Sequence, residues 1–337
     1  MDEPGAHSRR CAGVCQRSPA SIARRPPSRR RVALHPHSFF PRCSWFIFFS
    51  WRFPMIKVAA WCQDPSDATL RQLTQLGVDC VDALPLPTDD RGVFDLDEAL
   101  KMKKRVHSWG LQVNRISLPG LSMRFMDEED GAEEELDVAC ESVQVLGEAG
   151  YPLGRVHFDY STDPWMIGHY RASHRGGYLA RGDSLSLAEG DEPPTIAVRE
   201  QRWGRVCAAY ERLVPVAEAA GVRLMMHPSD PPTQDALFGG LGFHRVIDAF
   251  PNPCVGYLYC CGTRAEAGGL PLVLDEIHNY GRKGRLFEVH FRNVRASFAT
   301  AGAFEEVLLD DGDMNMFKIL RELKRVGYDG CLNPDHY

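Results

Sequence analysis

From residue 56 onward, the sequence alternates between short apolar runs and longer stretches with helical spacing of apolar residues. Runs of this length predict buried strands, and several of the helical stretches end at a glycine. The predicted strands are 56–62, 78–86, 111–117, 155–160, 222–228, 254–260, 285–291 and 330–335. The predicted helices between them are 67–77, 95–110, 133–150, 198–221, 242–250, 269–281 and 312–327. Eight strands with seven intervening helices predict an α/β fold, the (β/α)8 TIM barrel.

Two features separate the barrel from the other common α/β architecture. The predicted strands are continuous apolar runs, which is typical of parallel strands covered on both faces. The first strand-to-helix turn, "CQDPSDA" at 62–68, lacks the glycine-rich fingerprint of a doubly wound dinucleotide-binding sheet. No helical segment follows the strand at 330–335, so we expect a barrel that lacks its final helix and a chain that is truncated there.

The first 54 residues are of a different kind. They contain ten arginines, no lysine and two acidic residues, and they have neither helical nor strand periodicity. We expect residues 1–54 to be a disordered or non-native Arg/Ser/Pro-rich leader: either an organelle transit peptide or translated sequence upstream of a start at Met55. Residues 55–337 then form the catalytic barrel domain, with a polar insertion at about 161–195.

The overall composition excludes several classes of function. A chain of 337 residues with 44% hydrophobic residues and a net charge of −6 is typical of a soluble globular protein and predicts no nucleic-acid partner. It has no apolar run of about 18 residues, so we expect no membrane span. Its eleven cysteines are scattered without a CxxC motif, which favours a reducing compartment. We expect a cytoplasmic protein, or an organellar one if the leader is a real transit peptide.

Four consecutive predicted strands end in side chains that can bind a metal. These are His227, Cys260, His290 and Asp335. Reactive groups of barrel enzymes lie at the carboxyl ends of the strands, so these four should meet at one mouth. Each alone is weak evidence, because a lone histidine or cysteine in a strand is more often structural. Together, imidazole, thiolate and carboxylate suit a divalent ion such as Mn²⁺, Fe²⁺, Co²⁺ or Zn²⁺.

The residues beside these ends add candidate substrate contacts. Asp230 follows His227 in "HPSDPP", where the prolines predict a rigid loop that holds it near the mouth. Arg292 should face the same side as His290, because strand side chains alternate. It could grip a substrate carboxylate through two parallel hydrogen bonds, or form a salt bridge at the barrel rim.

Four segments together resemble the mannonate dehydratase family: "HPSDPP", "GYLYCCGT", "EVHFRNVR" and "GDMNMFKILRELKRVGYDGCLNPDHY". The resemblance implies a xylose-isomerase-like barrel and a lyase of carbohydrate metabolism, in glucuronate catabolism. Its reaction would be the dehydration of D-mannonate, a sugar acid, to 2-keto-3-deoxy-D-gluconate with a divalent metal, most often Mn²⁺, with Fe²⁺ or Co²⁺ as other candidates. It implies that His227, Cys260, His290 and Asp335 are the metal ligands.

Further roles follow from the same resemblance. His336 would be the catalytic acid or base, and Arg292 and Asn293 would lie at the substrate with Asp230. Family members continue past the Asp-His pair, whereas this chain ends at Tyr337. Two alternatives therefore stay open: a sugar isomerase or epimerase on the same barrel, and a catalytically impaired, truncated homologue that only binds. A homo-oligomer is also compatible with the sequence.

Overall fold

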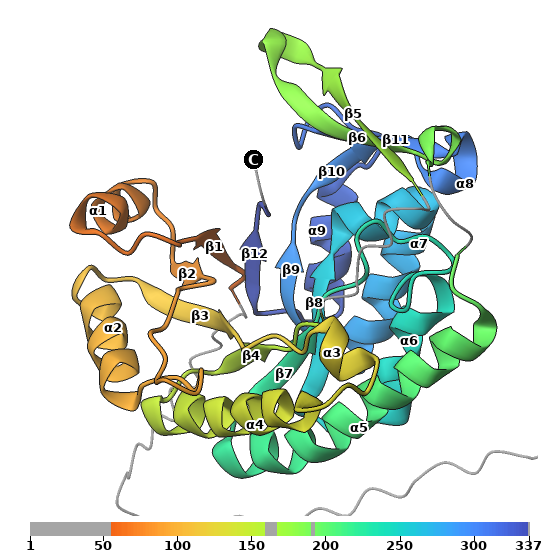
Figure 1. The fold of residues 1–337 in the computed structure, drawn as a ribbon. Helices are drawn as coiled ribbons and strands as arrows, with labels where there is room; N and C mark the ends of the chain where they lie inside the picture. The colour runs from red at the N-terminus through yellow and green to blue at the C-terminus, as the bar shows by residue number, and fades with distance from the viewer. Residues whose placement is uncertain (1–54, 159–166, 190–192, 336–337) are drawn as a thin grey trace, which may run out of the picture. The chain divides into compact units, whose positions relative to one another are not determined.

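A closed ring of eight parallel strands forms the centre of the molecule (Figure 1). The computed structural model describes residues 55–158, 167–189 and 193–335. Around the ring the strands follow the order β1, β12, β9, β8, β7, β4, β3, β2. Their bounds are β1 Lys57–Trp61, β2 Cys80–Asp82, β3 Gln112–Ser117, β4 Leu153–Arg155, β7 Arg223–Met226, β8 Val255–Cys260, β9 Leu286–His290 and β12 Cys331–Asn333. The predicted barrel is confirmed.

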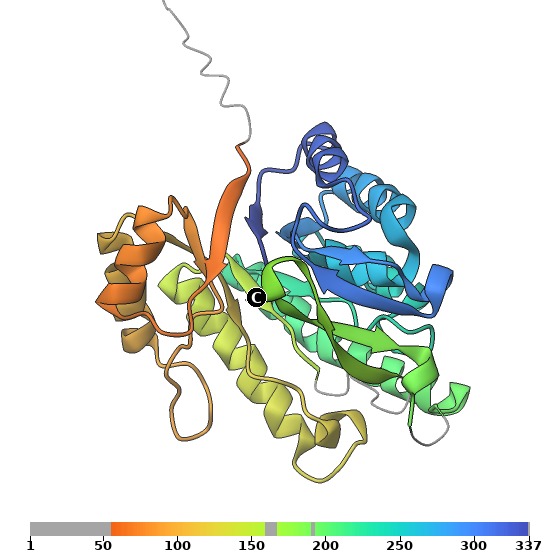
Figure 2. The ribbon, with the colours of Figure 1, turned by 90° about the horizontal axis from the view of Figure 1, so that it is seen from above.

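The helices lie on the outside of this ring, which Figure 2 shows from above. In the described residues, α4 packs on α5 and α7 packs on α9. The bounds are α1 Asp67–Gln75, α2 Leu96–Ser108, α3 Met123–Met126, α4 Ala132–Ala149, α5 Ile196–Ala220, α6 Gly240–Ala249, α7 Cys261–Arg282, α8 Phe298–Ala301 and α9 Met316–Arg325. The seven predicted helices correspond to α1, α2, α4, α5, α6, α7 and α9.

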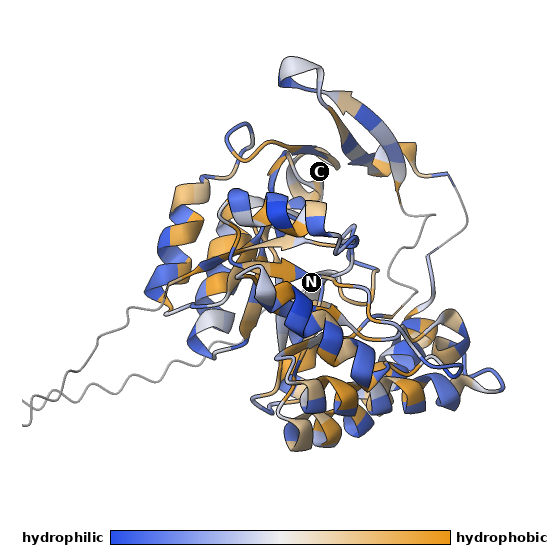
Figure 3. Cartoon of the chain, turned by 90° about the vertical axis from the view of Figure 1, so that its left-hand side faces the viewer, coloured by the Kyte–Doolittle hydropathy of each residue, from blue (hydrophilic) through white to orange (hydrophobic). Residues whose placement is uncertain are grey.

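Local sequence explains where the helices begin and end. Ser66 and Asp95 cap α1 and α2, where each side chain accepts a hydrogen bond from a backbone N–H of the first turn. Gly150 and Gly221 end α4 and α5 with φ of 72° and 68°, in the left-handed region that glycine adopts without steric cost. Figure 3 shows hydrophilic and hydrophobic residues alternating along these outer helices, as expected for helices with one buried face.

Two predicted boundaries are wrong. The fourth strand is β4 at Leu153–Arg155, not 155–160, so Arg155 ends the strand instead of beginning it. The helix predicted at 269–281 belongs to α7, which begins at Cys261 and is interrupted at Gly269, where φ is 68° and ψ is −168°. Pro271 lies two residues further on, inside the helix, where its ring removes one backbone hydrogen-bond donor.

Apolar residues fill the lower part of the barrel interior. Leu153, Met225, Leu258 and Phe287, one from each of four neighbouring strands, form a buried cluster separate from the core that faces the helices. Ala59, Cys80 and Cys331 form the matching cluster of β1, β2 and β12. The barrel is therefore packed at this level, and space for a ligand lies nearer the carboxyl ends of the strands.

A second, antiparallel sheet lies beside the carboxyl ends of the strands (Figure 1). It joins β5 Gly168–Ser173 and β6 Leu179–Ser184 to β10 Asn293–Arg295 and β11 Ala303–Val307, in the order β10, β11, β6, β5. Short 3-10 turns at Arg175–Gly177 and Leu185–Leu187 flank β6. The segment between β4 and α5 is thereby paired with the segment after β9.

Residues 1–54, where the leader is predicted, lie outside the described residues, as do 159–166 and 190–192 within the expected insertion. Within the described part, every cysteine is free. No helix in that part combines the length and apolar character that a membrane span requires.

Candidate metal centre and substrate pocket

The strand ends bring four metal-binding side chains to one mouth of the barrel. His227 directly follows β7, Cys260 ends β8 and His290 ends β9, while Asp335 lies two residues after β12. Ligand atoms of His227, Cys260 and His290 all lie within 4.8 Å of one another. Asp335 Oδ1 lies 2.9 Å from His290 Nδ1, and Asp335 Oδ2 lies 3.6 Å from Cys260 Sγ. We call these four residues the ligand cluster.

The register of the barrel produces this convergence. Cys260 is the Cα partner of His290, and His290 is the partner of Asn333 on β12. Beyond β12, Asp335 has a φ of 74°, in the left-handed region that few side chains adopt. Its backbone N–H donates to Asn333 Oδ1 at 2.9 Å, which anchors the turn that carries its carboxylate.

The ligand cluster has the chemistry of a divalent-metal site. His290 is 2% exposed, and its Nδ1 lies 2.9 Å from Asp335 Oδ1 while its Nε2 lies 3.5 Å from Glu288 Oε1. Neither nitrogen makes a well-aligned hydrogen bond within the described residues, and imidazole nitrogens beside a thiol and carboxylates are groups that a divalent ion can bind. Two imidazoles, one sulfur and one carboxylate suit Mn²⁺, Fe²⁺, Co²⁺ or Zn²⁺, so the residues fit a divalent ion.

The pKa values of the two histidines point the same way. Burial lowers the pKa of His227 to about 3, helped by the nearby positive charges of His290 and Arg155, so its imidazole is neutral and able to bind metal. Burial also acts to lower the pKa of His290, but Asp335, Cys260 and Glu288 outweigh it and raise that pKa well above its ordinary value. The surroundings of His290 are therefore rich in negative charge and favour a cation.

A buried polar layer supports the cluster from inside the barrel. Asp82 accepts hydrogen bonds from Asn114 Nδ2 at 2.9 Å and Asn333 Nδ2 at 2.6 Å. Glu288 accepts from Asn114 Nδ2 at 3.0 Å and pairs with Arg115 Nε at 2.8 Å, with both charged side chains fully buried. Burial alone would raise the pKa of Glu288, but Arg115 and neighbouring donors bring it to about 2. Four strands are thus tied together beneath the metal ligands.

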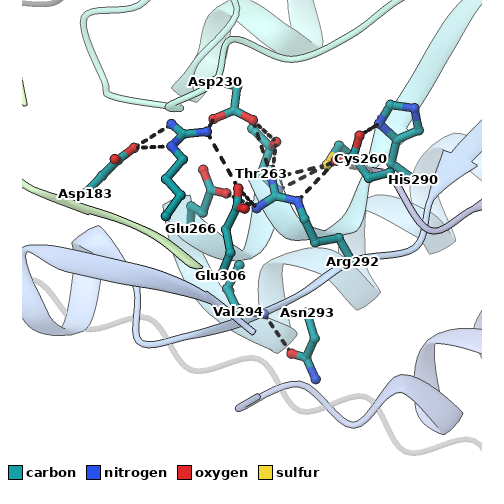
Figure 4. A network of polar contacts seen from close by, with 12 residues as sticks. Asp183, Asp230, Cys260, Thr263, Glu266, His290, Arg292, Asn293, Val294 and Glu306 are labelled. Carbon is teal, nitrogen blue, oxygen red and sulfur yellow. Dashed lines mark hydrogen bonds and ion pairs between the residues drawn. The ribbon is translucent and has the colours of Figure 1, made fainter. Parts of the chain in front are cut away.

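Arg292 lies at the ligand cluster and is surrounded by acceptors (Figure 4). It is 4% exposed. Its Nε donates to Asp335 Oδ2 at 3.1 Å, its Nη1 lies 2.8 Å from both Glu266 and Glu306, and its Nη2 donates to Thr263 Oγ1 at 3.1 Å. The guanidinium of Arg292 is thus buried and paired with three protein carboxylates, so it forms salt bridges inside the mouth and not at an exposed rim.

Asp230 lies in the wall of the same mouth. Its Oδ1 pairs with Arg181 Nη1 of β6 at 2.8 Å, and its Oδ2 accepts from Thr263 Oγ1 at 3.1 Å and from Arg292 Nη2 at 3.4 Å. These cations hold the pKa of Asp230 below its ordinary value against the opposing effect of burial. Asp230 therefore links the loop after β7 to the second sheet.

The structure does not bring Asn293 to the site. Figure 4 shows its side chain directed away from Cys260 and His290. Its Nδ2 donates to the carbonyls of Leu309 and Met314 at 2.8 and 3.1 Å, and its Oδ1 accepts from the N–H groups of Val294 and Met314 at 2.9 and 3.2 Å. In the structure Asn293 organises a loop. His336, predicted as the acid or base, lies outside the described residues.

A cavity of about 180 Å³ opens beside the ligand cluster. His227, His290 and Asp335 form part of its wall, and sequence reasoning missed two further wall residues, Trp61 and Arg155. Trp61 ends β1 and Arg155 ends β4, so both lie at carboxyl strand ends. Trp61 is the penultimate residue of the strand predicted at 56–62, so an inspection of strand ends could have found it. Arg155 was missed because the fourth strand was predicted to begin, and not to end, at this residue.

Comparison with known proteins finds one group of enzymes repeatedly. The family model described as "D-mannonate dehydratase (UxuA)" matches residues 197–337. A mannonate dehydratase of Thermotoga petrophila is 29% identical over 323 residues, which cover 83% of this chain and 88% of that protein. The chain is therefore similar to mannonate dehydratases, most specifically over residues 197–337. This similarity indicates a hydro-lyase.

Two further comparisons set the extent of the likeness to mannonate dehydratases. "Mannonate dehydratase 2" of Halalkalibacterium halodurans is 27% identical over 146 residues, which span only 41% of the length of either protein. The crystal structure of mannonate dehydratase from Streptococcus suis serotype 2 superimposes with a TM-score of 0.71 over 84% of each chain, at 21% identity. At that identity the superposition shows the shared fold.

Proposed function

We propose that the chain catalyses the metal-dependent dehydration of D-mannonate to 2-keto-3-deoxy-D-gluconate and water. The observation that carries the proposal is the convergence of His227, Cys260, His290 and Asp335 beside a cavity at the carboxyl end of the barrel. Similarity to mannonate dehydratases supports the substrate class. We propose these four residues as the ligands of a divalent ion, with Mn²⁺ as the first choice and Fe²⁺ or Co²⁺ as the others.

The reaction breaks two bonds of the sugar acid. The proton on C2 and the hydroxyl on C3 leave as water, and the resulting enol becomes the 2-keto acid when a proton is returned to C3. The bound ion would supply a Lewis acid that makes the C2 proton more acidic. A base must accept the C2 proton and an acid must assist the C3 hydroxyl, and an imidazole can serve either role near neutral pH. His336 remains the proposed residue for this step.

The described residues contribute orientation and charge. Arg292 donates to Asp335 and contacts Cys260 Sγ at 3.6 Å, so we propose that it fixes the positions of two metal ligands. The Glu288 and Asp82 layer holds the strand ends together from below. Asp230 lies where a substrate hydroxyl could reach it, and its depressed pKa keeps it an acceptor.

The experiment is an assay of the purified full chain with D-mannonate and Mn²⁺, measuring the 2-keto acid formed and the metal bound per chain. Metal-free protein and the Cys260→Ser variant are the controls, and a parallel panel of aldoses and ketoses tests isomerisation. Formation of 2-keto acid only from D-mannonate, and only with metal, is expected. A folded, metal-loaded sample that yields no 2-keto acid refutes the proposal, and a ketose product would favour an isomerase instead.

A further inference from the structure

The arginines around the barrel mouth differ in how their charge is balanced. Arg115 pairs with Glu288, and Arg181 pairs with Asp183 at 2.5 Å and with Asp230 at 2.8 Å. Arg292 contacts Glu266, Glu306 and Asp335. Arg155, in contrast, makes no hydrogen bond or ion pair with any residue that the structure describes, and its buried Nε has no acceptor there.

The position of Arg155 indicates where a group that accepts hydrogen bonds from its guanidinium would lie. It is the last residue of β4 and forms part of the wall of the 180 Å³ cavity, together with His227, His290 and Asp335. The barrel register pairs it with Met225, two residues before His227. An anion inside the cavity would therefore lie between the Arg155 guanidinium and the ligand cluster.

The Arg155 cation has no partner among the residues that the structure describes, and such a charge is unfavourable in a buried wall. Burial lowers the pKa of Arg155 to about 10, and the nearby charge of Arg115 acts in the same direction, while the more weakly acting charges of Glu288, Asp335 and Cys260 oppose it. The group still carries its positive charge at neutral pH, because the pKa stays well above 7. A desolvated charge without a partner is costly in a folded protein, so its retention indicates a ligand that supplies the opposite charge.

We propose that Arg155 is the residue that binds the carboxylate of the sugar-acid substrate and determines specificity for acids over neutral sugars. The inference rests on the proposed function. The planar guanidinium matches a carboxylate with two parallel hydrogen bonds, which a neutral polyol cannot reproduce. The proposal gives Arg155 the carboxylate-binding role that the sequence suggested for Arg292. The nitrogens of Arg292 already contact protein groups.

The test measures binding to the metal-loaded full chain by calorimetry, with D-mannonate and its neutral isostere D-mannonamide as probes. Arg155→Met should weaken D-mannonate binding by about 10- to 100-fold, the range for loss of hydrogen bonds to a charged group. Binding of D-mannonamide should stay unchanged, and Arg155→Lys should recover part of the loss. Arg223→Met is the matched control, because Arg223 lies at the opposite end of the neighbouring strand, 4.6 Å over the Phe287 ring.

Three readouts separate this role from a structural one. Arg155→Met should bind metal with wild-type stoichiometry. Its melting temperature should equal or exceed that of wild type, because the substitution leaves no partner in 55–158, 167–189 or 193–335 without its counter-charge. Equal losses of mannonate and mannonamide binding, a lowered melting temperature, or unchanged mannonate affinity would each overturn the assignment. If Arg155→Met does not fold, Arg155→Lys and Arg155→Gln carry the same acid-to-amide comparison.

A further binding measurement, with a small fragment of the substrate, distinguishes failure of the inference from failure of the proposed function. Glycolate carries the carboxylate and the adjacent hydroxyl of an aldonate without the rest of the sugar. If wild type binds glycolate but does not dehydrate D-mannonate, and Arg155→Met loses glycolate, the proposed reaction fails and the role of Arg155 stands. If wild type forms 2-keto acid from D-mannonate and Arg155→Met binds both acids as wild type does, only the inference fails.

Discussion

Replacing Asn293 by alanine should destabilise the protein without weakening substrate binding. Its side chain is 1% exposed and makes four hydrogen bonds, to the carbonyls of Leu309 and Met314 and from the N–H groups of Val294 and Met314. At about 0.5–1.5 kcal/mol net for each of the four bonds, the free energy of unfolding should fall by about 2–6 kcal/mol. The loss should be large because the substitution leaves buried backbone groups without partners.

The assay is urea unfolding of Asn293→Ala at fixed metal concentration, together with the KM for D-mannonate. Asn315→Ala is a matched control, because Asn315 caps α9 through one hydrogen bond of 3.0 Å to the Lys318 N–H. Loss of such a cap should cost about 1 kcal/mol. If Asn293→Ala is no less stable than Asn315→Ala while its KM rises strongly, Asn293 contacts substrate and the structural reasoning is refuted.

A neighbouring glycine gives a second test of the same contact. A Cβ added at Gly312 would lie 2.2 Å from Asn293 Oδ1, closer than any side chain tolerates. Gly312→Ala must therefore displace the Asn293 amide and break its hydrogen bonds. The substitution should cost less stability in the Asn293→Ala background than in wild type, by about 0.5–3 kcal/mol of coupling. Additive losses would show that the two residues do not touch.

Three further outcomes follow from the structure. Arg264→Met should lower the free energy of unfolding by about 3–5 kcal/mol, because it leaves the buried Glu276 carboxylate without its cation. Two Arg264 nitrogens lie 2.7 and 2.9 Å from that carboxylate. The double variant Arg264→Met/Glu276→Gln should recover much of the loss. The exposed Glu200 has a pKa lowered by Arg245, so their pairing stabilises the fold above the ordinary carboxyl pKa and is lost as pH falls through the folded value. Glu200→Gln should therefore cost about 0.5 kcal/mol at pH 7 and less at pH 3, by urea unfolding at both pH values. Chelation should lower the melting temperature, and Mn²⁺ at 100 times its dissociation constant should restore about 2.7 kcal/mol in wild type but not in His290→Ala.

The fold was predictable because parallel barrel strands must be apolar on both faces. β8, Val255–Cys260, is buried at every position, and a run of this kind is visible in the sequence without any tertiary information. Since reactive groups of a barrel gather at the carboxyl ends of its strands, reading the last residue of such runs was enough to bring His227, Cys260 and His290 together.

The failures come from contacts that lie far apart in the sequence. β4 is only three residues long, and the apolar residues after Arg155 continued its pattern past the true end. The pairing of β6 with β11 joins segments about 120 residues apart, and no local pattern encodes it. Asn293 follows Arg292 directly, but only the position of the 309–314 backbone shows that its amide is committed to a loop.

The ion pair between Arg181 and Asp230 has a consequence for how substrate preference diverges among related proteins. The hairpin of β5 and β6 neutralises an acidic wall residue that belongs to a different strand-end loop. Exchanging that hairpin for a relative's version without the arginine would leave Asp230 with less counter-charge and change the field inside the mouth. Substrate preference should then evolve through paired changes in two segments that are distant in the sequence. A hairpin graft made without a compensating change at position 230 should therefore still fold but should lose substrate selectivity.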